Sequence, residues 1–189
     1  MLHNLSDKEV LRRALLEKRQ AVEPDVRRQW DASIATQITA LLATHPVRTL
    51  GIYWPIRSEP DLRPLYAELA TCGVQLALPV VIAQDAPLRF AAWSPGEPLV
   101  KDALAVSIPA NADNTLHPDA LLIPCVGYNS DNVRLGYGGG FYDRTLATTP
   151  RPFTLGIAYS CAMAQFKGAP HDIPLDRIIT ELPAARDTA

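Results

Sequence analysis

Residues 120–146 read ALLIPCVGYNSDNVRLGYGGGFYDRTL, and the elements that they encode decide the fold class. Residues 120–126 form a continuous apolar run, which is typical of a β-strand buried on both faces. Glycines gather at 136–140, and a helix is expected to begin at Phe141 and continue to Leu146. A buried strand, a glycine loop and a helix in this order indicate an α/β fold.

The glycine loop has the composition of an anion-binding site. Glycine adopts positive φ angles and lets backbone N–H groups approach a phosphate, and the start of a helix adds further unpaired N–H groups. Arg134 precedes the loop and can bind a phosphate through two N–H groups. Asp143 follows it and offers a hard oxygen ligand for magnesium. The alternative is a turn that only reverses the chain, but the two flanking charges favour phosphate binding.

The rest of the chain alternates between helical and strand-like segments. Ser6 and Glu9 form a capping-box pattern at the start of a first helix, and Pro24 suits the first turn of a second helix. We expect that second helix to run from about Asp25 to Thr44. Further on we expect a helix over 61–72, loop and edge structure over 94–118, and strands over 47–54, 74–82, 88–93, 120–126, 153–159 and 177–180. The pattern predicts a three-layer α/β/α fold with a largely parallel sheet, helices on both faces and an N-terminal helical pair.

Composition and charge narrow the class of protein. The 189 residues include 48% apolar and 20% charged side chains, and the net charge is −2. Bulk charge therefore gives no support for a nucleic-acid or membrane partner. Three widely spaced cysteines form no zinc-binding pattern, and the N-terminus shows no apolar segment behind a basic start. We expect a cytoplasmic monomer with one domain over residues 1–189, no nucleic-acid partner and no membrane partner.

Four motifs spread over nearly the whole chain resemble one known family. The glycine loop, Arg134 to Arg144, is similar to the signature of the 5-formyltetrahydrofolate cyclo-ligases, also called 5,10-methenyltetrahydrofolate synthetases. The other three motifs follow the family's order: Lys8-Glu-Val-Leu-Arg12, then Tyr53-Trp-Pro55 followed by Glu59, and finally His171-Asp-Ile-Pro-Leu-Asp176.

The resemblance implies a reaction and its co-substrates. The family closes 5-formyltetrahydrofolate to 5,10-methenyltetrahydrofolate and uses ATP with magnesium. A formamide oxygen is a poor leaving group, and transfer of the γ-phosphoryl group onto it creates a phosphate that N10 of the folate can displace. We therefore expect ATP and 5-formyltetrahydrofolate as small-molecule substrates and Mg²⁺ as the cofactor. Catalysis of such a transfer depends mainly on positioning and charge stabilisation.

The resemblance also implies roles for single residues. Lys8, Arg134 and Tyr142 are the expected catalytic residues, and Asp143 and Asp176 are the expected metal ligands. Lys8 and Arg12 stand four apart, so a helix projects them from one face. The expected folate contacts are Trp54, Glu59 and Tyr142. The expected ATP contacts are Lys8, Arg12, Arg134, Gly136, Tyr137, Gly138, Gly139, Gly140, Phe141 and Tyr142.

For several of these residues a purely structural role is the alternative. Lys8 and Arg12 also fit a solvated basic face, Trp54 also fits the core, and Tyr137 also fits a packing role. His171 and Asp172 also fit a role in shaping their loop. No motif covers Arg13, Lys18 or Arg19, which we assign to the surface.

The chain departs from the family pattern at three single positions and in one segment. Asn129 stands where the family has a carboxylate, and Asn132 stands where it has a glycine, although asparagine also adopts the left-handed conformation. Cys125 replaces a common glycine, and residues 107–113 lack an expected Glu-Pro pair. Two other classes of protein are the alternatives: a catalytically silent relative that binds nucleotide or folate for regulation, and a different enzyme, such as a sugar-phosphate isomerase or an acyl-transfer protein, on a similar sheet.

Overall fold

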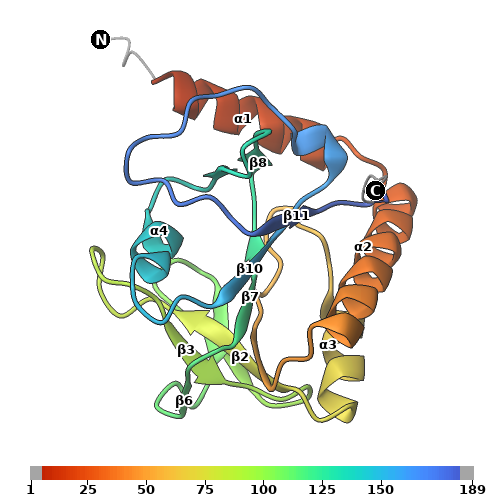
Figure 1. Cartoon of the computed structure of the whole chain (residues 1–189), viewed down its shortest axis with the longest axis vertical. Coiled ribbons are helices and arrows are strands. Elements are labelled where there is room, and N and C mark those ends of the chain that lie inside the picture. Colours follow the sequence, from red (N-terminus) through yellow and green to blue (C-terminus); the bar gives the residue numbers. More distant parts are fainter. Residues whose placement is uncertain (1–5, 184–189) are drawn as a thin grey trace.

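The computed structural model describes residues 6–183, and a seven-stranded β-sheet runs through its centre (Figure 1). Five adjacent strands of this sheet are parallel to one another, and two strands at one edge are antiparallel to their neighbours. The order across the sheet is β11 (Arg177–Ile179), β10 (Phe153–Ile157), β7 (Ala120–Pro124), β1 (Thr49–Gly51), β2 (Gln75–Val80), β3 (Arg89–Ala92) and β6 (Thr115–Leu116).

Two helices cover one face of the sheet, on the right in Figure 1. They are α2 (Pro24–Thr44) and α3 (Arg63–Thr71). Ile34, Ile38 and Tyr66 of these helices are fully buried and pack with Leu50 of β1 and Leu122 of β7. Side chains alternate between the two faces along a strand, so Leu122 points to this face and its neighbours point to the other.

A short helix, α4 (Phe141–Leu146), lies against the opposite face, on the left in Figure 1. Its Leu146 packs in one cluster with Leu121 and Ile123 of β7 and with Leu175, which precedes β11. This second layer contains less helix than the first within residues 6–183. The predicted class, a largely parallel α/β sheet with helices on both faces, is confirmed.

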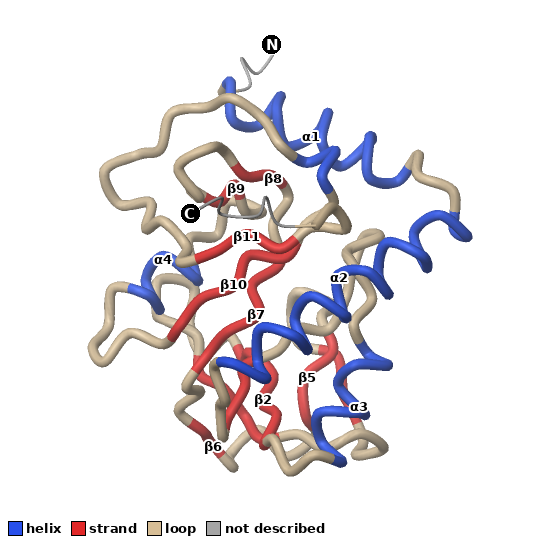
Figure 2. Tube along the Cα trace, turned by 45° about the vertical axis from the view of Figure 1, so that its right-hand side comes forward, coloured by secondary structure: helices blue, strands red, loops and turns tan. Residues whose placement is uncertain are grey.

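The first helix, α1 (Asp7–Gln20), crosses one end of the sheet rather than lying on a face, as Figure 2 also shows. The predicted capping box is present, because Ser6 and Glu9 bond each other's backbone N–H groups. Leu15 packs on Val126 and Leu135 in a small separate cluster. That cluster holds α1 over a two-stranded hairpin, β8 (Gly127–Tyr128) with β9 (Arg134–Leu135), which the sequence did not predict.

The remaining elements match the predicted segments with shorter strands. The segment 94–118 contains a second small hairpin, β4 (Leu99–Lys101) with β5 (Ser107–Pro109), and a 3₁₀ turn spans Ser160–Ala162. The predicted strand over 47–54 keeps only three residues in the ladder, since the chain leaves the sheet after Gly51 to enter the site. The prediction of one domain over 1–189 extends past the described residues and stays a prediction.

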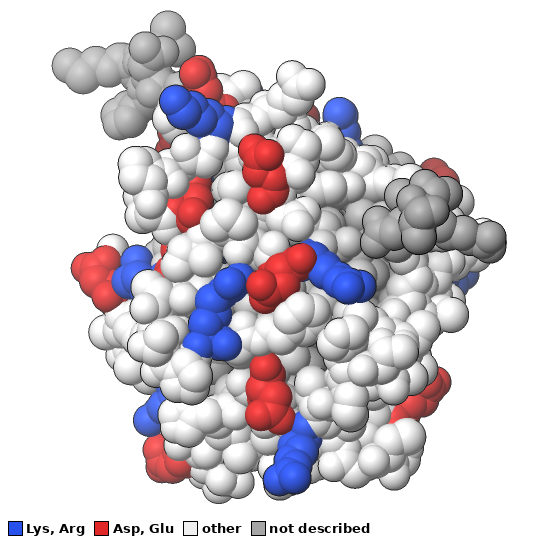
Figure 3. Space-filling view, in the orientation of Figure 1, with Lys and Arg blue, Asp and Glu red and all other residues white. Residues whose placement is uncertain are grey.

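Charge is evenly mixed on the face drawn in Figure 3, where acidic and basic side chains lie next to one another. This mixture agrees with the net charge of −2. Within residues 6–183 no helix is long and apolar enough to cross a bilayer.

Candidate functional site

Two cavities open at the edge of the sheet where the parallel strands end. The smaller has a volume of about 450 Å³ and is lined by Tyr53 and Trp54 after β1, Val81 after β2 and Pro124 at the end of β7. The wider has a volume of about 1180 Å³, and its lining includes residues 81–85, Asp143, Arg144, Pro170 and His171. The carboxyl ends of parallel strands are where open α/β sheets bind ligands.

The glycine loop forms the wall that the two cavities share. Gly138, Gly139, Gly140 and Phe141 line both of them. Gly138 and Gly140 have φ angles of 99° and 65°, which side chains disfavour, so the loop conformation depends on glycine. A ligand in either cavity therefore meets the same stretch of backbone.

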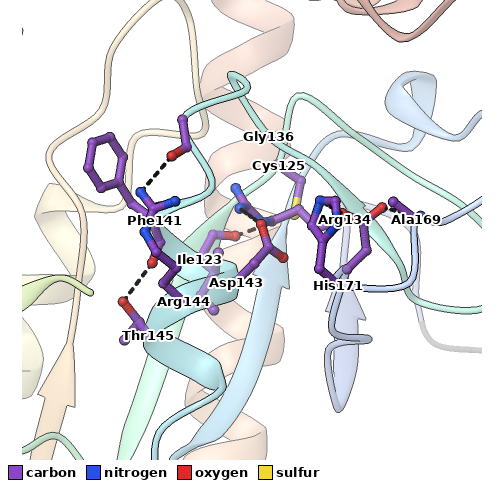
Figure 4. Close-up of polar contacts among 12 residues, drawn as sticks. Ile123, Cys125, Arg134, Gly136, Phe141, Asp143, Arg144, Thr145, Ala169 and His171 are labelled. Carbon is purple, nitrogen blue, oxygen red and sulfur yellow. Dashed lines mark hydrogen bonds and ion pairs between the residues drawn. The ribbon is translucent and has the colours of Figure 1, made fainter. Parts of the chain in front are cut away.

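Arg134 lies under the loop and is nearly buried, with 8% of its side chain exposed. Its guanidinium stacks over the Tyr142 ring at 4.9 Å, and Nη2 lies 3.7 Å from Oδ2 of Asp143 (Figure 4). A side chain at Gly136 would come within 2.5 Å of this guanidinium. The glycine at 136 therefore makes room for Arg134, which lines the smaller cavity together with Tyr142.

Lys8 and Arg12 both reach the loop region from α1, as their spacing predicts. Nε of Arg12 donates to the carbonyl oxygen of Gly136 at 2.8 Å. Nζ of Lys8 lies 2.8 Å from Oδ2 of Asp172, in the segment that also brings His171 to the wider cavity. The ammonium group lowers the pKa of Asp172, against the opposing effect of partial burial. The predicted basic pair thus stands beside the loop, with Lys8 neutralised by a carboxylate.

Tyr137 of the glycine loop faces the smaller cavity. It lines the smaller cavity and not the wider one, and Arg57 stacks over its ring at 5.4 Å. Its hydroxyl donates to Oε1 of Glu59 at 2.7 Å. The Tyr137 hydroxyl therefore contacts the residue expected to bind folate, and the expected contact of Tyr137 with ATP stays a prediction.

Glu59 is 4% exposed and lines the smaller cavity. Its Oε2 accepts the backbone N–H of Ile56 at 2.9 Å. Burial raises the pKa of Glu59, and the hydrogen bonds from Ile56 and Tyr137 and the charges of Arg19 and Arg134 oppose that rise. A buried carboxylate with donors on one side keeps acceptor capacity for a ligand on the other.

The assignment of Arg19 to the surface was wrong. This residue is 2% exposed, and its Nη2 donates to the hydroxyl of Tyr137 at 2.8 Å. Two signals in the sequence pointed to it: Arg19 follows Leu15 by four residues and Arg12 by seven, so a helix places all three on one face.

Trp54 is partly buried and contributes a wall of the smaller cavity. Its ring meets Trp93 edge to face at 5.6 Å, and the guanidinium of Arg63 lies 5.3 Å from the Trp54 ring centroid. The expected folate contact and the alternative core role are therefore both reflected in its position.

Asp176 is not at this site, and its expected role as a metal ligand needs correction. The residue precedes β11 beside the start of β10, at the opposite end of these strands from the glycine loop. Its Oδ2 accepts the backbone N–H of Thr154 at 2.8 Å and the hydroxyl at 2.7 Å, and Arg151 lies 3.4 Å from Oδ1. These contacts tie β11 to β10. Within residues 6–183 no three His, Cys, Asp or Glu side chains gather into a metal-binding cluster.

The structure shows how the three single-residue departures from the family pattern fit the fold. Asn129 closes the β8–β9 turn: its Oδ1 accepts the N–H groups of Asp131 and Val133, and its Nδ2 donates to the carbonyl of Phe166. A carboxylate could not make that last bond. Asn132 has a φ of 57°, so it does adopt the left-handed conformation. Cys125 is buried, which raises its pKa to about 12 and makes it an inert thiol.

Fold and site together define an α/β protein with a glycine loop between two ligand-sized cavities at the carboxyl edge of the sheet. The sequence profile of the 5-formyltetrahydrofolate cyclo-ligase family matches residues 4–181. The chain belongs to this family and is an enzyme of the ligase class.

Individual relatives agree in sequence and in structure. A 5-formyltetrahydrofolate cyclo-ligase of Mycoplasma pneumoniae is 31% identical over 180 residues, covering 93% of this chain and 99% of the relative. One from Escherichia coli K12 is 28% identical over 172 residues, covering 87% and 94%. A solved 5,10-methenyltetrahydrofolate synthetase of M. pneumoniae superposes with a TM-score of 0.76 at 31% identity, covering 93% of this chain and 99% of that one. The synthetase of Aquifex aeolicus gives 0.79 at 27% identity, covering 92% and 89%.

Proposed function

We propose that this enzyme closes 5-formyltetrahydrofolate to 5,10-methenyltetrahydrofolate, with ATP and Mg²⁺, and releases ADP and phosphate. The observation that carries the proposal is the glycine loop shared by the two cavities. One substrate must pass a phosphoryl group to the other, so their reacting atoms must meet, and the loop is where the two cavities meet.

The wider cavity is the proposed ATP site. Its shared wall is backbone with glycine at three successive positions, Gly138 to Gly140, which suits close approach of phosphates. Arg12 adds positive charge beside that wall, and Lys8 can add its charge when a phosphate displaces Asp172 from it. Arg134 lies between the cavities and is suited to stabilise the charge that develops on the transferred phosphoryl group.

The smaller cavity is the proposed folate site. Aromatic rings of Trp54 and Tyr142 offer faces for a flat pterin ring, and the buried carboxylate of Glu59 can accept its N–H groups. The formyl oxygen would then receive the γ-phosphoryl group, and attack of N10 on the formyl carbon would expel phosphate. Lys8, Arg134 and Tyr142 are the proposed catalytic residues.

Asp143 is the proposed protein ligand of magnesium. Its side chain is 19% exposed and lines the wider cavity beside Arg134, so its carboxylate faces the proposed phosphate positions. Magnesium usually takes one or two carboxylates, with substrate phosphates and waters completing its octahedron. Asp143 is the carboxylate of this cavity that stands next to both the glycine loop and Arg134, which favours it as a ligand. When bound, the ion would neutralise charge on the β- and γ-phosphates.

The test mixes the protein with 5-formyltetrahydrofolate, ATP and magnesium and follows methenyltetrahydrofolate by its absorbance. We expect product only when all three are present, with one ADP formed per product. Titration calorimetry with each substrate alone separates the alternatives. Tight binding of both substrates without turnover by the folded protein would instead support the regulatory, catalytically silent relative.

A further inference from the structure

A buried positive charge lies next to the smaller cavity without a carboxylate beside it. Arg19 is 2% exposed, and none of the ion pairs within residues 6–183 includes it. Arginine is almost never fully buried unless its charge is compensated. Two of its N–H groups donate to the carbonyl oxygens of Arg57, at 3.1 Å, and Cys125, at 3.3 Å. These carbonyls fix the guanidinium but supply no negative charge.

The third contact of Arg19 connects it, through one hydroxyl group, to the nearest carboxylate of this chain of hydrogen bonds, Glu59. Nη2 of Arg19 donates to the hydroxyl of Tyr137 at 2.8 Å, and that hydroxyl donates to Oε1 of Glu59 at 2.7 Å. Guanidinium, phenol and carboxylate thus form a chain of two short hydrogen bonds across three segments of the sequence. In a buried environment, the hydrogen bonds of such a chain polarise one another, so each bond strengthens the next.

The chain also holds the backbone on which Glu59 stands. The two residues before it, Arg57 and Ser58, have φ angles of 46° and 61°, a conformation that side chains disfavour. The carbonyl of Arg57 accepts Nε of Arg19, so the same guanidinium secures the strained turn and the phenol. Removal of Arg19 would release both.

We propose that Arg19, acting through Tyr137, is a positioning residue that holds Glu59 as an ionised hydrogen-bond acceptor directed into the smaller cavity. The identification of the ligand as a folate rests on the proposed function. The ionised state of the Glu59 carboxyl does not depend on that function. Tyr137 and Ile56 occupy one acceptor position on each carboxylate oxygen. A carboxylate has about four such positions, so about two stay free for a ligand N–H.

Charged and titratable groups surround Glu59 on several elements. Burial has the largest effect and raises the pKa of Glu59, while the hydrogen bonds from Ile56 and Tyr137 and the charges of Arg19 on α1 and Arg134 on β9 favour the ionised form. The neutral groups near it stay neutral, since burial raises their pKa values well above the working range; they are Tyr53, Tyr66, Cys125, Tyr137 and Tyr142. Loss of the Arg19 charge or of the Tyr137 hydroxyl removes support for the carboxylate form, so the pKa of Glu59 must rise.

The experiment compares Tyr137→Phe and Arg19→Met with Lys18→Met, an exposed neighbour on the same helix. Carbon-13 NMR of glutamate-labelled full-length protein follows the Glu59 carboxyl, identified by its loss in Glu59→Gln. We expect Glu59 to titrate at higher pH in both test variants and unchanged in Lys18→Met. Tyr137→Phe removes one oxygen and keeps the ring, so it carries the test even where Arg19→Met fails to fold.

A kinetic measurement then connects the carboxylate to the reaction. In the test variants we expect kcat/KM for the folate to fall about fivefold more at about pH 6 than at about pH 8. A raised pKa of Glu59 moves the acid limb of the pH profile, where kcat/KM falls as Glu59 is protonated, to higher pH. KM for ATP should stay within about twofold. A purely structural role would lower the melting temperature and leave the limb in place.

The outcomes separate the two proposals. If Glu59 titrates as in the wild type in a folded Tyr137→Phe protein, the proposal that Arg19 acts on Glu59 through Tyr137 is overturned, whatever the activity. If the pKa of Glu59 rises in the two variants but the wild-type protein makes no methenyltetrahydrofolate, the positioning role of Arg19 stands and the proposed reaction is removed.

Discussion

Lys8 is held in the described structure by a carboxylate that a phosphate would have to replace. Its Nζ lies 2.8 Å from Asp172, and about a third of the side chain, 32%, is exposed. An ion pair this accessible is weak in water, so a nucleotide phosphate with several charges can compete for the ammonium group. Lys8 is therefore available for ATP, with Asp172 as its partner when the nucleotide is absent.

Replacing Lys8 by alanine should raise KM for ATP about tenfold and leave KM for the folate within about twofold, since a charge-assisted bond to phosphate contributes about 1.5–3 kcal/mol. Steady-state kinetics with each substrate varied in turn measures both constants. Lys18→Ala removes the same charge from the exposed side of α1 and should change neither. Equal rises in both constants for Lys8→Ala would mean that this lysine does not meet the phosphates.

Asp143→Asn keeps the size and one oxygen of the side chain but removes its charge. We expect the magnesium concentration for half-maximal activity to rise about tenfold and the rate at saturating magnesium to fall, because the amide is a weaker ligand for a hard cation. The change also removes the negative charge that pairs with Arg134 at 3.7 Å. Magnesium titration of initial rates is the measurement, and an unchanged magnesium requirement would contradict the assignment.

Single residues also mark where prediction from sequence failed. Motifs named Lys8, Arg12 and Glu59, and the structure brings Arg12 to Gly136 of the loop, Lys8 to Asp172 and Glu59 to the smaller cavity, while their roles toward ligands stay predictions. Arg19 was missed because a charged residue type outweighed its spacing from Leu15. Asp176 was misplaced because a carboxylate in a motif can either bind a ligand or stabilise the fold. Its hydrogen bond from the Thr154 hydroxyl shows the stabilising role.

At the scale of elements, the glycine loop acts through its backbone. Gly138 has a φ of 99°, and a methyl group there would lie 3.6 Å from the Arg12 guanidinium, an ordinary contact. The cost of a side chain at this position is therefore in the backbone conformation rather than in a clash.

Gly138→Ala should raise KM for ATP about tenfold while the melting temperature falls by only a few degrees, because the strained loop changes course where it meets both cavities. Gly96→Ala is the matched control: Gly96 has a φ of 95°, and nothing lies within 4 Å of a methyl group there. It stores similar strain far from the loop and should leave KM unchanged. Parallel losses of stability with no difference in KM would show that the loop conformation does not matter for ATP.

Element boundaries were predictable where local signals were strong. Pro24 begins α2 and the capping box begins α1, as their local chemistry requires. The β8–β9 hairpin escaped prediction because each strand has two residues, too short for any period to show. Its turn depends on Asn129 reaching Phe166, 37 residues further on, and no local pattern encodes that contact.

At the scale of the whole molecule, the site exists because distant segments meet at one edge of the sheet. Residues from α1, the segment between β1 and α3, and the loop before α4 form the Arg19–Tyr137–Glu59 chain. Alternation of strands and helices predicted the sheet, and the strand ends predicted the edge. Which side chains meet at that edge, such as Arg19 with Tyr137, depends on the packing of the whole chain. Local sequence patterns do not encode such contacts.

The end of the sheet opposite the site, where the central parallel strands begin, offers a test of what joins these strands. Asp119 stands just before β7, its backbone pairs with Thr49 and Phe153, and its Oδ2 accepts the N–H groups of Arg48 and Thr49, both at 2.9 Å. Hydrogen bonds from Thr49 and Arg48 lower the pKa of Asp119. One residue thus ties the starts of β1, β7 and β10.

Asp119→Asn should lower the free energy of unfolding near neutral pH by roughly 0.5–1.5 kcal/mol, the usual contribution of a hydrogen bond. A carboxyl whose folded pKa is lowered stabilises the fold above its unfolded pKa, and this contribution is lost as pH falls through the folded value. The difference between wild type and variant should therefore shrink as pH is lowered from about 7 to about 3. Urea unfolding across that range measures it, and Asp113→Asn, at an exposed position, should show no such trend. A difference independent of pH would mean that Asp119 acts through its shape rather than its charge.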